Sequence, residues 1–308
     1  MLILNEHNLI YSIYFKQMIK TVFHKFLYFI DLGRYNNLSG AFLLMWPCFW
    51  GLTYNGIFDF DFVKYFFLFF VGAIVMRGAG CTFNDIIDSK IDAKVKRTKN
   101  RPIASKKITV VEGLFFLFLQ LLVGFVVLIN FDIKVIFSGL LILPFIFIYP
   151  YLKRLTFFPQ IFLGLIFNWG IFLGYFCNYE SIDIGVIYLY FAGVFLTTGY
   201  DTIYGYQDIN DDTKIGVKSL SIKTKNYPKR AVGFVYILSL IFLFLSVMQT
   251  NKVSYLNIIF LFIIGFCLYF QIKKINLTNK NQLMNIFKSN VYLGGIIFVL
   301  FLFNNFNF

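Results

Sequence analysis

Two groups of acidic residues in this chain have the spacing of oxygen ligands on a helix. In the first group, Asn84, Asp88 and Asp92 recur every four residues, with Asp85 beside them. Residues four apart lie on one face of a helix, so these oxygens are expected to be close together. Carboxylates this close repel one another, and a divalent cation relieves that repulsion. Mg²⁺ prefers such hard oxygen ligands and completes its shell with water and phosphate.

Arginines follow the first acidic group along the chain. Arg97 and Arg101 carry planar guanidinium groups, which bind phosphate oxygens through paired hydrogen bonds, and Thr98 lies between them. For the carboxylates taken alone, a solvated loop of mixed charge at the end of a membrane span is an alternative interpretation. The arginine and threonine pattern favours a site for a phosphorylated ligand.

The second acidic group combines side chains at two expected depths. Four of its residues are spaced i, i+3, i+7 and i+11, on one face of a continuing helix: Asp201, Tyr204, Asp208 and Asp212. The first two are nearer the apolar core, where an ionisable side chain is costly and is therefore a functional candidate. Asp211 adds a carboxylate, and Lys218 adds a point charge for phosphate. The two groups together could hold two Mg²⁺ ions around one diphosphate and so assist its departure.

The elements that position these groups are expected to be membrane-spanning helices. Of the 308 residues, 59% are hydrophobic and only 14% are charged, whereas about a quarter are charged in a soluble domain. Nine apolar stretches have the length of a tilted transmembrane helix: residues 38–56, 62–84, 111–130, 134–150, 159–178, 184–204, 230–250, 254–272 and 286–305. The sequence therefore predicts an all-α integral membrane bundle of nine transmembrane helices, organised as one domain over residues 1–308.

The basic residues are distributed unevenly between the two sides of this bundle. With a cytoplasmic N-terminus, most of the 28 Lys and Arg residues fall on the inside, and the outside loops hold only Lys64, Lys134 and Lys252. This distribution follows the positive-inside rule and accounts for the net charge of +13, so no nucleic-acid partner is expected. Both acidic groups then face the cytoplasm or the mitochondrial matrix, and the C-terminus lies outside.

The N-terminal segment, residues 1–33, contains a helical pattern with two faces. Its basic positions recur every four residues beside apolar ones, Lys16, Lys20 and His24 against Phe15, Ile19, Phe23 and Leu27. This pattern is typical of an amphipathic helix that lies in the membrane interface. A short soluble cap is the alternative interpretation.

Three segments of the chain resemble those of a known family, the UbiA superfamily of membrane prenyltransferases. Its first signature is similar to residues 78–105, GAGCTFNDIIDSKIDAKVKRTKNRPIAS. Its second signature, in the form typical of the branch that acts on 4-hydroxybenzoate, is similar to residues 200–219, YDTIYGYQDINDDTKIGVKS. Residues 149–170, YPYLKRLTFFPQIFLGLIFNWG, resemble the segment between the fourth and fifth spans of that branch.

The resemblance implies a nine-helix bundle around a central cavity and a particular reaction. That reaction is the Mg²⁺-dependent transfer of a polyprenyl group from polyprenyl diphosphate to the ring of 4-hydroxybenzoate, ortho to the hydroxyl, in ubiquinone biosynthesis. The family binds the Mg²⁺–diphosphate through residues that match Asn84, Asp85, Asp88, Asp92, Asp208, Asp211 and Asp212. The expected location is a bacterial or mitochondrial inner membrane.

The acceptor of this reaction carries a carboxylate, so its site needs a cationic side chain. Three arginines on the expected inner side are candidates for this role, Arg34, Arg77 and Arg154, and Lys153 is a further candidate for substrate binding. Arg154 is favoured for the acceptor because it lies in the KRLTFFPQ stretch of the resemblance. Arg77 and Arg154 can also be ordinary interfacial side chains whose charged ends reach the headgroups.

Departures from the family pattern concern the acceptor side. Asn36 and Leu38 stand where the family often has an acidic residue and a proline, and Leu196 stands where it often has tryptophan. Two other functions stay open: a UbiA-type enzyme with another aromatic acceptor, and a cation transporter that uses the Asp clusters. The form of the second signature argues against the first. Transporters tend to bind ions near the midplane, whereas most of these carboxylates are at span ends.

Overall fold

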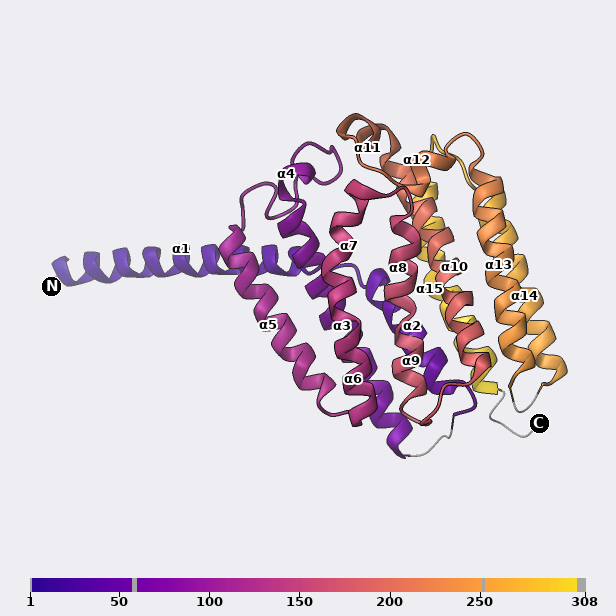
Figure 1. Ribbon diagram of the computed structural model, residues 1–308. Helices are drawn as coiled ribbons and strands as arrows, with labels where there is room; N and C mark the ends of the chain where they lie inside the picture. Colours follow the sequence, from indigo (N-terminus) through magenta and orange to yellow (C-terminus); the bar gives the residue numbers. More distant parts are fainter. Residues whose placement is uncertain (1, 57–59, 251–252, 304–308) are drawn as a thin grey trace. The chain divides into compact units, whose positions relative to one another are not determined.

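The computed structural model describes residues 2–56, 60–250 and 253–303, and it describes side chains in these ranges except at positions 2–16, 60 and 153. The described residues form helices and connecting turns without a β-strand, which confirms the all-α prediction. The helices follow one another in the order shown in Figure 1: α1 Leu2–Leu32, α2 Ser39–Thr53, α3 Phe60–Ile87, α4 Ser89–Asp92, α5 Val110–Leu128, α6 Ile133–Leu141, α7 Leu143–Leu155, α8 Pro159–Asn168, α9 Gly170–Tyr175, α10 Ile184–Gly205, the 3₁₀ helix η1 Tyr206–Asp208, α11 Ile209–Ile215, α12 Leu220–Thr224, α13 Pro228–Met248, α14 Tyr255–Lys273 and α15 Lys280–Phe303.

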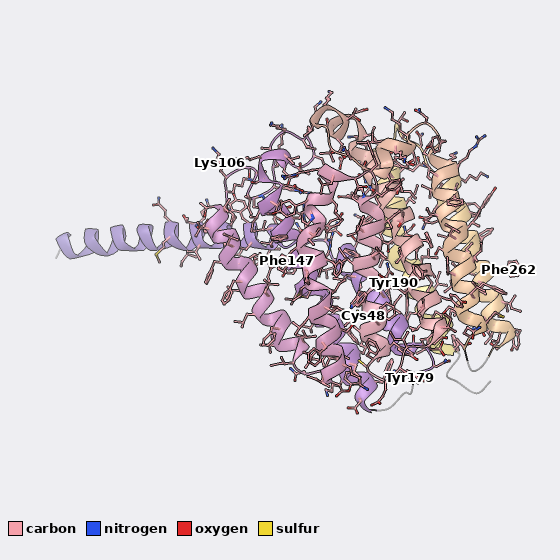
Figure 2. The ribbon with its side chains drawn as sticks, in the orientation of Figure 1. Cys48, Lys106, Phe147, Tyr179, Tyr190 and Phe262 are labelled. Atoms are coloured by element: carbon pink, nitrogen blue, oxygen red, sulfur yellow. The ribbon has the colours of Figure 1, made fainter. Side chains whose placement is uncertain are left out.

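Among the described residues, seven helical segments are long and apolar enough to cross a membrane: Asp61–Ile87, Val110–Leu128, Ile133–Leu152, Ile184–Ile215, Pro228–Met248, Tyr255–Lys273 and Lys280–Phe303. Large apolar side chains on them are exposed; Phe262, for example, points away from α14 and is 76% exposed (Figure 2). Such exposure is costly in water and ordinary in lipid. The chain is therefore an integral membrane protein. The other two predicted spans, 38–56 and 159–178, contain shorter helical segments: α2, with 15 residues, and Pro159–Tyr175.

Two of the predicted spans are interrupted rather than straight. The predicted span 134–150 is interrupted at Ile142, between α6 and α7, and Pro144 lies in the first turn of α7. A proline is well tolerated there because the first turn of a helix has no partner for its N–H groups. The second breaks at Trp169, between α8 and α9, and the Trp169 indole donates a hydrogen bond of 3.0 Å to the carbonyl of Ser138 in α6.

The chain divides into two compact units, and each is described by itself. The small unit comprises Met1–Asn37 and Gly78–Gln120, and the large unit comprises Leu38–Arg77 and Leu121–Phe308. The core of the small unit is made of apolar residues from α1, α3, α5 and the loop before α5: Leu32, Ile103 and Ile108, with Tyr28, Phe29, Ile86 and Phe116 packed against them. This core fixes the loop that follows the first acidic group.

The large unit is built around α10, which packs against α8, α13 and α15. A second close contact joins α2 to α9 through glycines. A Cβ at Gly51 would overlap the carbonyl oxygen of Ile171, and a Cβ at Gly174 would overlap that of Cys48. Small residues at helix interfaces let backbones approach in this way, which is a common means of association in membranes.

Candidate active site

The first acidic group keeps its helical spacing although α3 ends inside it. The amide of Asp88 donates to the carbonyl of Asn84 at 2.9 Å, and the amide of Asp92 donates to the carbonyl of Asp88 at 2.8 Å. These bonds connect the last turn of α3 to α4 with the i to i+4 pattern of a helix. The predicted alignment of Asn84, Asp88 and Asp92 is therefore present, and the side chains of Asp88 and Asp92 are buried.

Asp85 is bound by two arginines in the small unit. Nη2 of Arg34 donates to both of its carboxylate oxygens, at 3.0 and 2.7 Å. Nη1 of Arg101 donates to Oδ1 of Asp85 at 3.0 Å and to Oδ2 of Asp92 at 2.7 Å. We refer to Arg34, Asp85, Asp92 and Arg101 as the arginine–carboxylate network. Asp85 is only 2% exposed, so its charge depends on these two partners.

The network keeps Arg101 positively charged. Burial by itself would lower the pKa of Arg101, but the nearby carboxylates of Asp85 and Asp92 raise it above the ordinary arginine value. The loop around Arg101 is held by two further bonds, from Thr98 Oγ1 to the carbonyl of Asp92 at 3.0 Å and from Ser105 Oγ to the carbonyl of Arg101 at 2.8 Å. Arg101 is thus a fixed positive charge beside the first acidic group.

Arg34 reaches Asp85 through an unusual backbone conformation. Its φ angle is 58°, in the left-handed region that most residues avoid. The guanidinium also donates to the carbonyl of Asp31 at 2.6 Å, and Asn36 donates to the Asp31 carboxylate at 2.7 Å. Sequence reasoning did not predict the pairing of Arg34 with Asp85, because 51 positions separate the two residues and no local pattern connects them.

The second acidic group lies in the large unit, on a segment that is helical throughout but irregular. α10 ends at Gly205, the 3₁₀ helix η1 follows, and α11 begins at Ile209. The predicted continuation of the helix is therefore present over Ile184–Ile215, but a 3₁₀ turn makes it irregular. A 3₁₀ turn has three residues per turn instead of 3.6, so it rotates the residues after it relative to those before it. Asp201 and Tyr204 precede the turn, whereas Asp211 and Asp212 follow it.

Hydrogen bonds between neutral groups hold the chain around η1. Ser221 Oγ donates to the carbonyl of Thr202 at 2.9 Å, and the amide of Leu220 donates to Oε1 of Gln160 at 3.0 Å. The hydroxyls of Tyr206 and Thr224 share a hydrogen bond of 2.8 Å. We call this set the neutral network. It joins the start of α8 to the segment that carries Lys218, two stretches that the sequence analysis had singled out separately.

Aromatic side chains support the deeper part of the second group. The ring of Tyr204 lies 4.7 Å from that of Phe287 in α15, measured between centroids. The Tyr200 hydroxyl accepts a bond of 3.1 Å from Thr197, which accepts one of 2.8 Å from Asn168 in α8. These contacts fix the face of α10 that carries Asp201 and Tyr204.

The remaining basic residues have different surroundings. Arg77 is half-buried in the large unit; its guanidinium lies 5.5 Å from the ring of Phe167 and occupies the space that a Cβ at Gly40 would need. Arg154 is exposed and lies 5.8 Å from the ring of Tyr151. Arg97 is exposed as well, and the side chain of Lys153 lies outside the described residues. Lys218 Nζ is 3.5 Å from the carbonyl of Leu155 and 5.7 Å from the ring of Phe157.

The donor set fits Mg²⁺ bound together with a phosphorylated ligand. In the part of the chain that the structure describes, no three acidic, cysteine or histidine side chains form a ready-made metal cluster. Mg²⁺ does not need one, since it usually takes one or two protein carboxylates and completes its shell with water and substrate phosphate. Within the small unit, Asp88 and Asp92 carry such carboxylates and Asn84 carries an amide oxygen; within the large unit, Asp208 carries another carboxylate.

Two proteins of known name are similar to this chain over most of its length. It is 34% identical over 288 residues to the 4-hydroxybenzoate octaprenyltransferase of Pasteurella multocida (strain Pm70), covering 92% of this chain and 97% of the relative. It is 44% identical over 200 residues to the mitochondrial 4-hydroxybenzoate polyprenyltransferase of Arabidopsis thaliana, a match that spans about half of that protein, 48%.

Solved structures share the fold at low sequence identity. A UbiA homolog from Aeropyrum pernix K1 has a TM-score of 0.70 at 20% identity, over 85% of this chain and 96% of that one. A UbiA homolog from Archaeoglobus fulgidus bound to GPP and Mg²⁺ has a TM-score of 0.64 at 14% identity, over 90% and 99%. The model of the UbiA prenyltransferase family matches residues 44–300. This chain therefore belongs to the UbiA prenyltransferase family.

Proposed function

We propose that this protein transfers a polyprenyl group from polyprenyl diphosphate to the ring of 4-hydroxybenzoate, ortho to the hydroxyl, with release of diphosphate. The reaction would be a membrane step of ubiquinone biosynthesis. The observation that carries the proposal is the similarity over 92% of the chain to a 4-hydroxybenzoate octaprenyltransferase, together with both acidic groups of the family signatures. The membrane-spanning helices supply the apolar surroundings that a long prenyl chain requires.

The two acidic groups have one task in this proposal, the binding of the diphosphate with Mg²⁺. The Mg²⁺ ligands would be Asn84, Asp88, Asp92, Asp208, Asp211 and Asp212. When bound, Mg²⁺ neutralises the charge that develops on the leaving diphosphate. Arg97, Arg101 and Lys218 are proposed to contact phosphate oxygens, as charge-assisted donors.

Arg101 is also held in place by carboxylates, which fixes its positive charge before the ligand binds. Its side chain is fixed and positive in the arginine–carboxylate network, so it needs little rearrangement to meet developing negative charge. Asp85 is therefore proposed to act by positioning Arg34 and Arg101. This role differs from direct metal binding, which we assign to Asp88 and Asp92.

The proposed chemical step is an electrophilic substitution on the aromatic ring. The allylic carbon–oxygen bond breaks, and its electron pair leaves with diphosphate. The ring carbon ortho to the hydroxyl then forms a bond to the allylic carbon, and the ring loses a proton to a base. We propose the released diphosphate or Asp201 as that base, with Tyr204 beside Asp201 on the same part of α10.

The acceptor carboxylate needs a cation, and the surroundings of the arginines support Arg77. Arg34 is already bound to Asp85, and Arg154 is exposed. Arg77 is half-buried in the large unit, beside Phe167 and Gly40. Placing a cation at membrane depth is energetically costly, so a cation found there is a functional candidate. Arg77 is therefore the stronger candidate for binding the acceptor carboxylate. This choice differs from Arg154, which the sequence alone favours.

The proposed function is tested with purified membranes that contain the protein, Mg²⁺, 4-hydroxybenzoate and prenyl diphosphates of several lengths. We expect prenylated 4-hydroxybenzoate and free diphosphate in equal amounts. A second set of reactions contains other aromatic acceptors in place of 4-hydroxybenzoate. Turnover with one of those acceptors, and none with 4-hydroxybenzoate, would contradict the proposed substrate while leaving the reaction class intact.

We further propose that the protein lies in a bacterial or mitochondrial inner membrane, with its N-terminus and acidic groups on the cytoplasmic or matrix side. The support is the concentration of Lys and Arg on that side. A phosphatase or fluorescent reporter fused after the last residue should report the opposite side. A reporter signal from the cytoplasmic side would show that the number of crossings is even.

A further inference from the structure

Helix α1 has two chemically different faces, and side chains on both faces are exposed between residues 17 and 27. One face carries Met18, Val22 and Phe26, which are 56%, 63% and 58% exposed. The other carries Gln17, Thr21 and His24. Each set follows helical spacing, so the two stripes run side by side along the helix. α1 is not among the described helices that qualify as membrane spans.

The C-terminal end of α1 shows which way each stripe faces. Phe29 continues the apolar stripe, and its ring lies 5.0 Å from that of Phe116, in the second turn of α5. Tyr28 continues the polar stripe, and Lys107 Nζ lies 4.9 Å from its ring. Between these contacts, Lys25 forms an ion pair with Glu112 in the first turn of α5. All of these residues belong to the small unit.

These contacts set the level of α1 relative to the start of a membrane span. α5 begins at Val110, so Phe116 is inside the span and Lys107 precedes it. The apolar stripe therefore faces the direction in which α5 enters the membrane, and the polar stripe faces the water. Figure 1 shows α1 extending away from the first turns of α5.

We propose that α1 lies flat in the lipid interface of the bilayer that the protein spans. Met18, Val22 and Phe26 would enter the boundary between headgroups and acyl chains, and Ile19 and Phe23 widen the same apolar face beside Phe26. Lys20 lies between the two faces, where its ammonium can reach lipid phosphates. This placement covers apolar side chains that would otherwise face water, and it does not depend on the proposed reaction.

Lipid fits this face better than a second copy of the chain. Helices that pair within membranes usually meet through small residues, which let their backbones approach. The exposed stripe of α1 has instead bulky residues, Val22, Phe23 and Phe26 among them. Basic residues beside such a stripe match the negative phosphates of an interface, and they would repel their counterparts in a symmetric pair.

Spin labels on the full-length protein in liposomes test this placement. Single cysteines are introduced at Val22 and Phe26 on the apolar stripe, with Thr21 and His24 on the polar stripe as matched controls. The native cysteines are replaced by alanine, and the collision rates of each label with oxygen and with a water-soluble nickel chelate are measured. We expect several-fold more oxygen than nickel contact at Val22 and Phe26, and the reverse at Thr21 and His24.

Two results would overturn the proposal. Equal nickel contact on both stripes would mean that α1 is a cap in water. Low contact with both reagents at Val22 and Phe26, with spin–spin broadening between labels, would mean that a second copy covers the stripe. Should the cysteine replacements impair folding, Val22→Trp and Thr21→Trp in the native background give the same comparison. Brominated lipid should then quench the added fluorescence of V22W and leave that of T21W unchanged.

A pair of charge variants sharpens the same test. Val22→Glu with Phe26→Glu should release α1 from the interface, so nickel contact at a label on residue 18 rises several-fold. Gln17→Glu with Thr21→Glu adds the same charge to the polar stripe and should leave residue 18 unchanged. An equal response to both pairs would mean that added charge, and not the loss of the apolar stripe, moves the helix.

Discussion

The two acidic segments of this protein are positioned by different kinds of contact. In the small unit, Asp85 and Asp92 are held by ion pairs with Arg34 and Arg101. In the large unit, the contacts that we describe around η1 join hydroxyls, amides and carbonyls. Removing one partner of a buried ion pair strongly lowers the free energy of unfolding, because the other charge is left uncompensated. Removing one hydrogen bond between neutral groups lowers it less.

This difference has a consequence for how the two segments respond to substitution. The first segment should behave as a connected set in which each member supports the others. The second should lose stability in small steps as individual bonds are removed. Both segments are proposed to bind the same diphosphate, so their contributions to activity should be similar even though their contributions to stability differ.

The largest expected effect tests whether the two segments are equal in function. Asp88→Ala and Asp208→Ala should each reduce turnover by at least about 100-fold, because each removes a carboxylate from preorganised charge stabilisation of the transition state. The measurement is the rate of prenyl transfer at saturating substrates and Mg²⁺.

Two controls accompany these variants. Each variant should remain folded in detergent, as judged by its elution in size-exclusion chromatography, because neither residue belongs to the arginine–carboxylate network. EDTA should stop the unsubstituted enzyme, and added Mg²⁺ should restore it. Turnover that survives either substitution, or that persists in EDTA, would contradict the assignment of both segments to the Mg²⁺–diphosphate.

The next largest effect is on the stability of the small unit, which the arginine–carboxylate network supports. Arg101→Ala removes the partner of two carboxylates and should lower the free energy of unfolding by about 3 kcal/mol, since a buried charge loses its compensation. Arg34→Ala should cost less, because Asp85 keeps Arg101 as a partner. Denaturant unfolding in detergent measures both variants.

A double variant checks the cause of that loss. Asp85→Asn in the Arg34→Ala background removes the carboxylate that Arg34 compensates, so it should recover part of the stability lost by the arginine substitution alone. If the double variant loses more free energy of unfolding than the two single variants lose together, the network does not act as a set of paired charges.

The third effect lies in the large unit and concerns acceptor binding. Arg77→Ala should raise the KM for 4-hydroxybenzoate by about tenfold or more, because a charge-assisted hydrogen bond contributes roughly 1.5–3 kcal/mol. The KM for prenyl diphosphate should change far less. Arg77→Lys should recover only part of the loss, since a planar fork becomes a point charge.

Arg154→Ala is the matched comparison for Arg77→Ala, because both remove an arginine from the large unit. It should leave the KM for 4-hydroxybenzoate near its original value. The opposite pattern, a large effect from Arg154→Ala and none from Arg77→Ala, would return the acceptor role to Arg154. An effect of Arg77→Ala on prenyl diphosphate alone would assign that arginine to the donor.

The smallest effect tests the neutral network. Gln160→Met removes the acceptor of the Leu220 amide and should cost about 1 kcal/mol of stability. It should also raise the KM for prenyl diphosphate modestly, since Lys218 lies two residues before Leu220. Gln120→Met in the small unit removes a similar bond, from Gln120 to the Tyr35 hydroxyl. Equal effects of both variants on that KM would argue against a positioning role for Gln160.

Local spacing predicted much of this architecture, because helices repeat every few residues. The alignment of Asn84, Asp88 and Asp92 is an example, since it depends only on backbone hydrogen bonds four residues apart. The apolar lengths likewise predicted a membrane bundle. The 3₁₀ turn at Tyr206–Asp208 escaped prediction because its i to i+3 bonds leave no distinct mark on hydrophobic periodicity.

Contacts between distant segments were less accessible to sequence reasoning. Arg34 is one of several candidates for substrate binding on sequence grounds, and no local pattern connects it to Asp85, which it binds. The choice between Arg77 and Arg154 depends on which side chain faces the interior, and a lone arginine near a span end gives no sign of that. The resemblance to the UbiA superfamily supplied the reaction, which the spacing of carboxylates alone would have left as diphosphate chemistry.

The contact between α2 and α9 also constrains how this sequence can change over generations. Every single-base change that replaces a glycine with another residue adds a Cβ, and at Gly51 or Gly174 that carbon would meet a backbone carbonyl. Backbone cannot move aside as a flexible side chain can. On the outer surface of the bundle, by contrast, one apolar residue can replace another, since lipid adapts to its shape. Inherited variation should therefore collect on the lipid-facing surface and be nearly absent from these two glycines.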